Sequence, residues 1–276
     1  MDVVLSDRYR MFVEEVGAGA PVVVLHGGPG MDHTMFRPYL DVLGDEFRLL
    51  YVDERGQGRS DRVDPTTLSL ERFARDVDLL ANALELDRFA LLGHSFGAII
   101  ATWHAIHQGT ADAYVISGGG DSSDALMEDV DASLQAMGEA GKAIAESWER
   151  EQHVETEDEL AQITRDQMPF HFAGAPPEGF AAATVHTPDV LRHFARAGYG
   201  DFDFRPGLGS VDRPTLVITG GEDRTTTTRA AQVLHDGIHG SEFVVLEGAG
   251  HMSFVESQDA YNDAVRRFLR GAALGS

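Results

Sequence analysis

Residues 93–97, Gly-His-Ser-Phe-Gly, follow the G-x-S-x-G pattern, in which a serine can act as a nucleophile. They stand between an apolar run at 88–92 and an apolar stretch at 98–107, a pattern that indicates a strand turning sharply into a helix. Such a turn exposes the serine hydroxyl on a strained backbone, and side chains two residues to either side would collide. A helix start behind Ser95 also favours developing negative charge. We therefore predict that Ser95 is a nucleophile.

A serine nucleophile needs a base and a carboxylate that orients the base. His251 lies in a glycine-flanked loop just after the last apolar strand, and Asp223 directly follows the strand before it. Both positions are expected at the carboxyl edge of the sheet, where open α/β sheets place their active sites. The order serine, acid, histidine is the one that this kind of fold uses. Glu222, the neighbour of Asp223, remains the alternative acid.

Attack on a carbonyl also requires hydrogen-bond donors for the oxyanion. The backbone N–H of Phe96, directly after the serine, is expected to be one donor. The second is expected from the loop after the first buried strand, where residues 26–30 read His-Gly-Gly-Pro-Gly. We predict the Gly28 N–H for this role, with Gly27 as the alternative, because glycine lets the backbone approach a substrate closely.

The elements that must position these residues form two groups of strands and helices. Strands are predicted at 9–16, 22–25, 47–52, 88–92, 114–117, 215–219 and 243–246, with helices at 70–86, 98–107, 226–234 and 258–269 between and after them. Continuous apolar strands separated by helices indicate a parallel sheet covered on both faces. The acidic stretch 121–212 lacks comparable strands and has helix-like pieces at 124–137 and 140–154. We predict an α/β core of residues 1–120 and 213–276, interrupted by a helical cap insert at 121–212.

Composition excludes several classes of protein. The chain has 276 residues with 22 Lys+Arg against 45 Asp+Glu, a formal net charge of -23, and no cysteine. Without cysteine there can be no disulfide scaffold, iron–sulfur cluster or cysteine nucleophile. The acidic surplus argues against binding to nucleic acid or to an anionic membrane. We find no targeting segment or spanning segment and expect a cytoplasmic protein without a cofactor or metal.

These motifs resemble those of the proline iminopeptidase (prolyl aminopeptidase) group of α/β-hydrolases. The resemblance rests on the loop at 26–30 and on Asp53-Glu54-Arg55-Gly56-Gln57-Gly58-Arg59-Ser60, which is similar to the group's D-x-R-G-x-G-x-S turn. It covers about 185 residues in the two core halves and is loose in the insert. It implies an eight-stranded, mostly parallel sheet with a helical cap over the nucleophile. It also implies Ser95 as nucleophile, Asp223 as acid and His251 as base, while Asp53 and Arg55 are interpreted as structural.

The resemblance extends weakly to substrate recognition. Proline iminopeptidases are expected to hold the substrate's free amino group with cap carboxylates. Ser147-Trp148-Glu149 is similar to part of the W-x-x-W-E segment of some members, although the first tryptophan is missing here. The resemblance therefore implies Glu149 as a substrate-binding residue, together with Glu146 one turn earlier and Trp148 beside them. In a chain with 45 acidic residues, a solvated surface charge is the competing interpretation for each glutamate.

The function expected from the sequence is that of a serine hydrolase working through an acyl-enzyme. The first candidate activity is that of an aminopeptidase that releases N-terminal proline or another small apolar residue from peptides, and the expected partner is a short peptide or a small molecule. An esterase, lactonase or C–C bond hydrolase could use the same residues, because fold and triad do not determine the substrate. A hydrolase-like binding protein or receptor is the remaining alternative.

Overall fold

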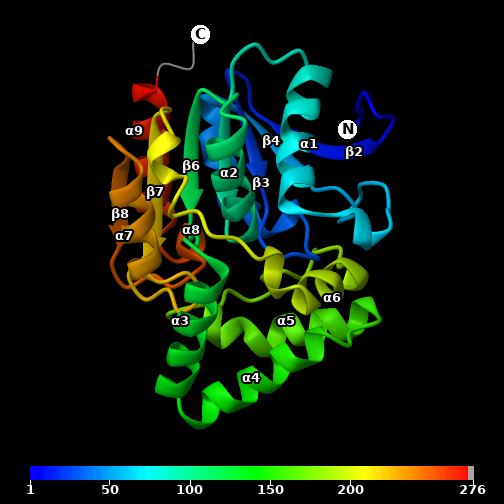
Figure 1. Ribbon diagram of the computed structural model, residues 1–276, viewed down its shortest axis with the longest axis vertical. Helices are drawn as coiled ribbons and strands as arrows, with labels where there is room; N and C mark the ends of the chain where they lie inside the picture. The colour runs from blue at the N-terminus through cyan, green and yellow to red at the C-terminus, as the bar shows by residue number, and fades with distance from the viewer. Residues whose placement is uncertain (273–276) are drawn as a thin grey trace.

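One eight-stranded sheet runs through the molecule in the order β1-β2-β4-β3-β5-β6-β7-β8 (Figure 1). β1 pairs antiparallel with β2, β2 pairs antiparallel with β4, and all other neighbours are parallel. This confirms the predicted eight-stranded, mostly parallel sheet. The strands are β1 (Asp2–Val4), β2 (Arg10–Val16), β3 (Ala20–Leu25), β4 (Phe47–Asp53), β5 (Ala90–His94), β6 (Ala113–Ser117), β7 (Thr215–Gly220) and β8 (Glu242–Leu246).

The structure, a computed structural model, describes residues 1–272. The last four residues of the predicted core segment 213–276 lie outside the described residues. Among residues 1–272, no helix has both the length and the apolar character that crossing a membrane requires. Between the elements of the first half of the chain stand short 3-10 turns, of which residues 33–36 and 41–45 pack beside β4.

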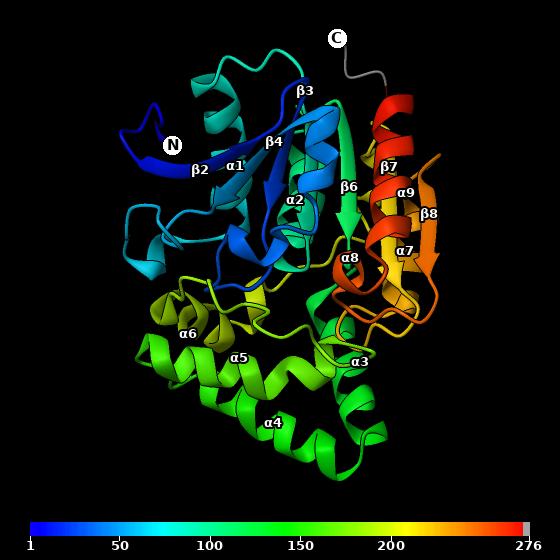
Figure 2. The ribbon, with the colours of Figure 1, turned by 180° about the vertical axis from the view of Figure 1, so that it is seen from behind.

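Helices cover both faces of the sheet because the central strands are apolar on both sides. Val23 and Leu25 of β3 face one hydrophobic cluster, which includes residues of α1 (Leu70–Ala83), α2 (Phe96–His107) and α7 (Thr228–Gly237). Val22 and Val24 of the same strand face a second cluster, which includes α9 (Gln258–Gly271). Figure 2, the view from behind, shows α9 and the short α8 (Ser253–Glu256) on the face opposite α1 and α2. The alternation of side chains along each strand thus builds two cores.

Between β6 and β7 the chain forms a group of helices that we call the helical insert, residues 121–212. Its helices are α3 (Ser123–Ala136), α4 (Glu139–Glu151), α5 (Glu157–His171) and α6 (Pro188–Arg196). In both views they lie beyond the carboxyl ends of the parallel strands (Figures 1 and 2). The helices predicted at 124–137 and 140–154 correspond to α3 and α4, whereas α5 and α6 are additional. The insert is therefore placed where it can cover residues that follow the strands.

Hydrogen bonds tie the helical insert to the loops at the carboxyl edge of the sheet, among them those of Glu256, Arg224 and Thr187. The Glu256 carboxylate of α8 accepts hydrogen bonds from Gly174 N at 2.8 Å in the insert and from Gly250 N at 2.7 Å in the core. Arg224 donates to the Phe172 carbonyl at 2.9 Å. Thr187 N donates to the Gly30 carbonyl at 2.8 Å. The insert is thus fastened beside each of the loops that the sequence singled out.

Candidate active site

Ser95 stands at the turn from β5 into α2, with a backbone φ of 55°. A positive φ is costly for a serine, and such strain is expected where a turn must present one hydroxyl. The two flanking glycines are required by space. A Cβ at Gly93 would lie 2.1 Å from the Gly97 carbonyl oxygen, and a Cβ at Gly97 would lie 2.4 Å from the Leu25 carbonyl oxygen. The collision expected from the sequence is therefore present, and it explains both glycines.

His251 and Asp223 meet at the carboxyl edge of the sheet. Nδ1 of His251 lies 2.8 Å from Oδ2 of Asp223, and both side chains are buried. Oδ1 of the same carboxylate accepts from the backbone N–H groups of Thr225 at 2.8 Å and Thr226 at 3.0 Å. Because Nδ1 is engaged by Asp223, Nε2 is the nitrogen left for a reacting group. Glu222, the alternative acid, is exposed and has no hydrogen bond with His251 among the described residues.

The electrostatics of Asp223 suit a carboxylate that stays ionised. Burial alone would raise its pKa, but the charge of His251 and the hydrogen bonds from His251, Thr226 and Thr225 lower the pKa of Asp223 below its ordinary value. An ionised Asp223 holds the imidazole in the tautomer whose Nε2 can accept a proton. The pair can therefore serve as an oriented base.

The loop at 26–30 lies directly over the serine. A Cβ added to Gly27 would come within 3.2 Å of the Ser95 Cβ, so the backbone of this loop approaches Ser95 as closely as glycine allows. Gly28, with a φ of 132°, and Phe96, the first residue of α2, both line the same cavity as Ser95. Among the described residues, the Gly28 N–H donates to no acceptor, and a first-turn amide such as that of Phe96 has none within its helix. Both predicted residues thus line the cavity, as the oxyanion prediction requires.

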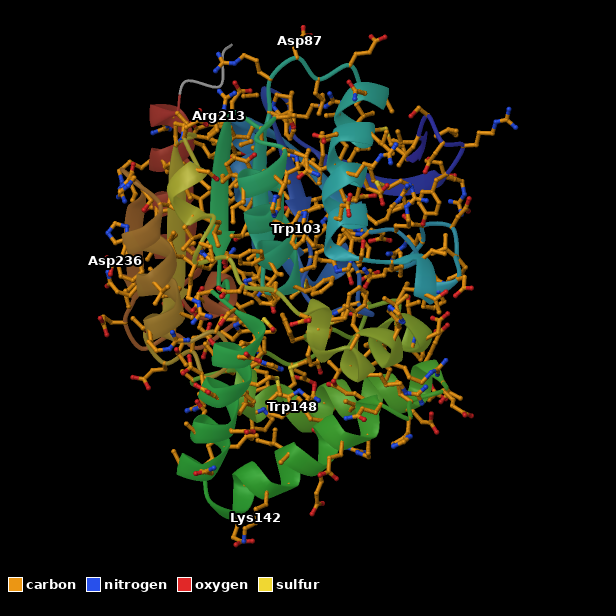
Figure 3. All side chains as sticks on the ribbon, viewed as in Figure 1. Asp87, Trp103, Lys142, Trp148, Arg213 and Asp236 are labelled. Atoms are coloured by element: carbon orange, nitrogen blue, oxygen red, sulfur yellow. The ribbon has the colours of Figure 1, made fainter. Side chains whose placement is uncertain are left out.

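A cavity of about 390 Å³ separates the sheet edge from the helical insert. On the core side it is lined by Ser95, Phe96, His251, Gly27 and Gly28, and on the insert side by apolar residues that include Met127, Trp148 and Met168. Figure 3 shows Trp148 among the helices of the insert, whereas Lys142, the chain's one lysine, lies at their outer end. The size and the largely apolar lining suit a small organic substrate.

Of the cap glutamates nominated from the sequence, only one reaches the cavity. Glu149 lines it but is exposed, and Glu146 is exposed and is not among the lining residues. The buried acid of the cavity is Glu151, which sequence reasoning missed. Glu151 continues the buried face of α4 that runs through Ile144 and Ser147, and this spacing was the signal that could have found it.

Glu151 belongs to a small polar cluster inside the insert. Its Oε1 accepts a hydrogen bond from Gln167 Nε2 at 2.6 Å, and its Oε2 accepts one from the Tyr199 hydroxyl. Burial raises the pKa of Glu151 to about 7, although these two hydrogen bonds act in the opposite direction. The carboxyl group therefore changes charge near neutral pH, and it is the cavity's one buried carboxyl in the described part of the chain.

The raised pKa of Glu151 gives a prediction about stability. Because this pKa is about 7 in the folded protein and 4.5 for an ordinary glutamate, the folded state binds more protons between these values, and its stability falls as pH rises through them. Glu151→Gln removes this contribution. Between pH 4 and pH 8, the free energy of unfolding of the variant should therefore rise by about 3 kcal/mol relative to that of wild type. Urea unfolding at both pH values measures this change. Exposed Glu149→Gln is the matched control, and an equal difference between Glu151→Gln and wild type at both pH values would contradict the assignment.

A second histidine, His171, accompanies His251 from the insert side. The two ring centroids are 5.4 Å apart, and Nδ1 of His171 lies 3.0 Å from the Thr225 hydroxyl oxygen. Burial and the proximity of His251 lower the pKa of His171 to about 3, so the imidazole is neutral at physiological pH. It lines the cavity without adding positive charge. No pattern in the sequence marked His171 as a site residue, in contrast to His251, which follows a predicted strand.

The turn at 53–60 forms a structural network beside the 26–30 loop. Asp53 bonds to His33 Nδ1 at 2.5 Å and to Arg59 N at 2.8 Å, and Arg55 makes two hydrogen bonds of 2.7 Å to Asp76. Burial would raise the pKa of Asp53, but the hydrogen bond and charge of His33 lower it to about 2. Asp32, His33 and Asp53 form a group that could hold a metal ion, yet Arg59 already pairs with both carboxylates. The network supports the structural interpretation of Asp53 and Arg55.

The sheet topology and the sharp turn from β5 into α2 indicate a hydrolase fold, and comparison with known proteins agrees. The chain belongs to the alpha/beta hydrolase fold family, whose profile matches residues 20–258. It is 29% identical over 257 residues to 3-oxoadipate enol-lactonase 1 of Acinetobacter baylyi, covering 91% of this chain and 89% of that protein. It is 25% identical over 272 residues to the proline iminopeptidase of Saccharolobus solfataricus, covering 92% and 86%. The structure of the proline iminopeptidase of Mycobacterium smegmatis matches with a TM-score of 0.80 at 22% identity, covering 99% of this chain and 98% of that one.

Proposed function

We propose that the protein is a serine hydrolase that releases a small N-terminal residue, such as proline, from short peptides or aminoacyl amides. Ser95 Oγ attacks the carbonyl carbon while His251 takes its proton, and the N–H groups of Gly28 and Phe96 stabilise the oxyanion. His251 then protonates the departing amine, leaving an acyl-enzyme on Ser95. Water attacks this ester with His251 again as base, which frees the amino acid and restores the serine hydroxyl.

The observation that carries this proposal is the charge of the cavity lining. Three carboxylate residues contribute to it, Glu151 in its buried part and Asp131 and Glu149 where it opens, and no lysine or arginine lines it within the described chain. A largely apolar cavity whose charged lining residues are all acidic favours a substrate with a cationic amino group and disfavours an anionic one. Buried Glu151 is in our proposal the carboxylate that pairs with the ammonium, in place of Glu149 or Glu146.

A second candidate is hydrolysis of a neutral ester or lactone by the same residues. The observation that favours it is that burial raises the pKa of Glu151 to about 7, so the carboxyl group is only partly ionised at neutral pH, and Tyr199 and Gln167 already donate to its two oxygens. The similarity to an enol-lactonase agrees with this candidate. The apolar lining would hold the acyl group in either case.

A substrate screen with two matched variants separates the candidates. We expect wild type to cleave proline p-nitroanilide far faster than its N-acetylated analogue. Glu151→Gln should lower kcat/KM for the free amine about 10- to 100-fold, the range expected for a lost hydrogen bond to a charged group, and leave p-nitrophenyl acetate hydrolysis nearly unchanged. Glu149→Gln, which removes an exposed charge, should have a small effect on both. Equal rates on the free and acetylated anilides, with good ester turnover, would favour the second candidate.

A further inference from the structure

The imidazole of His26, the first residue of the 26–30 loop, is fully buried behind that loop. Its Nε2 lies 3.3 Å from the backbone N of Glu54, and its Nδ1 lies 2.7 Å from the carbonyl oxygen of Gly27. A backbone N–H can only donate, so Nε2 is the acceptor and carries no proton. Nδ1 therefore bears the hydrogen and donates it to the Gly27 carbonyl.

This hydrogen bond fixes the orientation of one peptide unit. The carbonyl of Gly27 and the N–H of Gly28 belong to the same peptide bond, which is trans, because the cis bonds of the described residues are Gly28–Pro29 and Arg37–Pro38. In a trans peptide the C=O and the N–H point in opposite directions. With the Gly27 oxygen held toward buried His26, the Gly28 N–H is turned the other way, toward the cavity that Gly28 and Ser95 line.

The carboxyl group of Glu54 lies behind the loop and supports its far end through Gln57. One oxygen, Oε2, lies 3.7 Å from His26 Nε2 and accepts a hydrogen bond from Gln57 Nε2 at 2.9 Å. The amide oxygen of Gln57 in turn accepts a hydrogen bond from Gly30 N at 2.5 Å. Glu54 is buried, and its Oε1 has no partner among the described residues. Burying a carboxyl oxygen without a hydrogen-bond partner is unfavourable, which indicates that Glu54 has a role under this loop.

We propose that His26 and Glu54 are positioning residues that aim the Gly28 N–H at the oxyanion. His26 holds the Gly27–Gly28 peptide by its carbonyl, and Glu54 sets the histidine tautomer through its backbone N–H and braces Gly30 through Gln57. This inference rests on the proposed function, because an oxyanion forms only if Ser95 attacks a carbonyl. Neither side chain lines the cavity, so both act through the loop and not by touching the substrate.

Variants of His26 test the proposal through the division between kcat and KM. Losing one oxyanion donor costs about 10²- to 10³-fold in kcat. His26→Phe fills the same space but cannot donate, so kcat on p-nitrophenyl acetate should fall by about that factor with KM little changed. His26→Asn can place its amide nitrogen where Nδ1 lies, so it should restore most of kcat. His104→Phe is the matched control, since His104 is equally buried in α2, bonds to Tyr114 and does not line the cavity.

Two further measurements are the kinetics of Glu54 variants and the protonation of the His26 ring by NMR. Glu54→Gln keeps an acceptor for Gln57 and should retain most of kcat, whereas Glu54→Leu should lower kcat without raising KM. Nitrogen-15 NMR of uniformly labelled wild type, which needs no substrate, should show His26 protonated at Nδ1. Protonation of His26 only at Nε2 would overturn the inference and leave the proposed function standing. The same holds if His26→Phe keeps the kcat of wild type, or if the kcat of His26→Asn is no higher than that of His26→Phe. A wild type that neither hydrolyses esters nor reacts with a fluorophosphonate would overturn both.

Discussion

Ser95→Ala is expected to abolish hydrolysis of every substrate of this protein, with kcat lower by at least about 10⁴-fold. The reason is that in the proposed mechanism this hydroxyl forms the covalent bond. Among the described residues, the cavity hydroxyls of Thr225 and Thr226 are engaged by His171 and Asp223. The same variant should no longer react with a fluorophosphonate, which wild type should bind covalently at one residue. Steady-state kinetics and intact-protein mass spectrometry measure the two effects.

The control for Ser95→Ala is an exposed serine outside the cavity, Ser210, whose replacement by alanine should change neither activity nor labelling. The Ser95 hydroxyl makes no hydrogen bond with another described residue, so thermal unfolding of Ser95→Ala should stay close to wild type. Hydrolysis that persists in a folded Ser95→Ala protein would refute the serine mechanism.

Asp223→Asn is expected to lower kcat by about 10⁴-fold while preserving the fold. Oδ1 of Asp223 is held by the backbone N–H groups of Thr225 and Thr226, so the asparagine must keep its oxygen there and turn its NH₂ toward His251. An NH₂ group facing Nδ1 can only donate, which moves the imidazole proton to Nε2. The histidine then cannot accept the proton of Ser95.

Glu222→Gln is the matched control for Asp223→Asn, because it removes one charge from the adjacent, exposed residue. Its kcat should stay within about twofold of wild type, as expected for a surface charge. Comparable losses in the two variants would show that the net charge of this loop matters and that the hydrogen bond to His251 does not.

The core of the fold was predictable from sequence because its strands are buried on both faces. Short continuous apolar runs rich in β-branched residues, such as 22–25 and 114–117, are typical of strands in a covered parallel sheet. Strand β1, only three residues long with two exposed side chains, carries no such pattern and was missed. Its position depends on pairing with β2, which a local pattern does not reveal.

Site residues were predictable where their neighbours in the sequence, such as glycines or the end of a strand, constrain the backbone. They were hard to predict where only burial in the folded protein distinguishes them from other residues of the same type. Glycines mark the serine turn and the 26–30 loop, and Asp223 and His251 each follow a recognisable strand. Glu151 has only its helical spacing from Ile144 and Ser147, which is a weak signal among 45 acidic residues because its partners Tyr199 and Gln167 come from other segments. Helix α5 did carry a signal, the capping box of Thr156 and Glu159, but Pro169 interrupts its helical pattern.

The hydrogen bonds that attach the helical insert to the core determine which part of the insert can be exchanged in a chimaera. Residues 172–174 contact Arg224 and Glu256, which adjoin the loops of Asp223 and His251, while Thr187 is bonded to Gly30. Exchanging the whole of 121–212 for the insert of a relative would therefore discard the partners of these loops. A chimaera that replaces α3, α4 and the first turns of α5, with both junctions inside the insert and residues 169–191 retained, changes most of the substrate-facing lining and leaves these attachments in place.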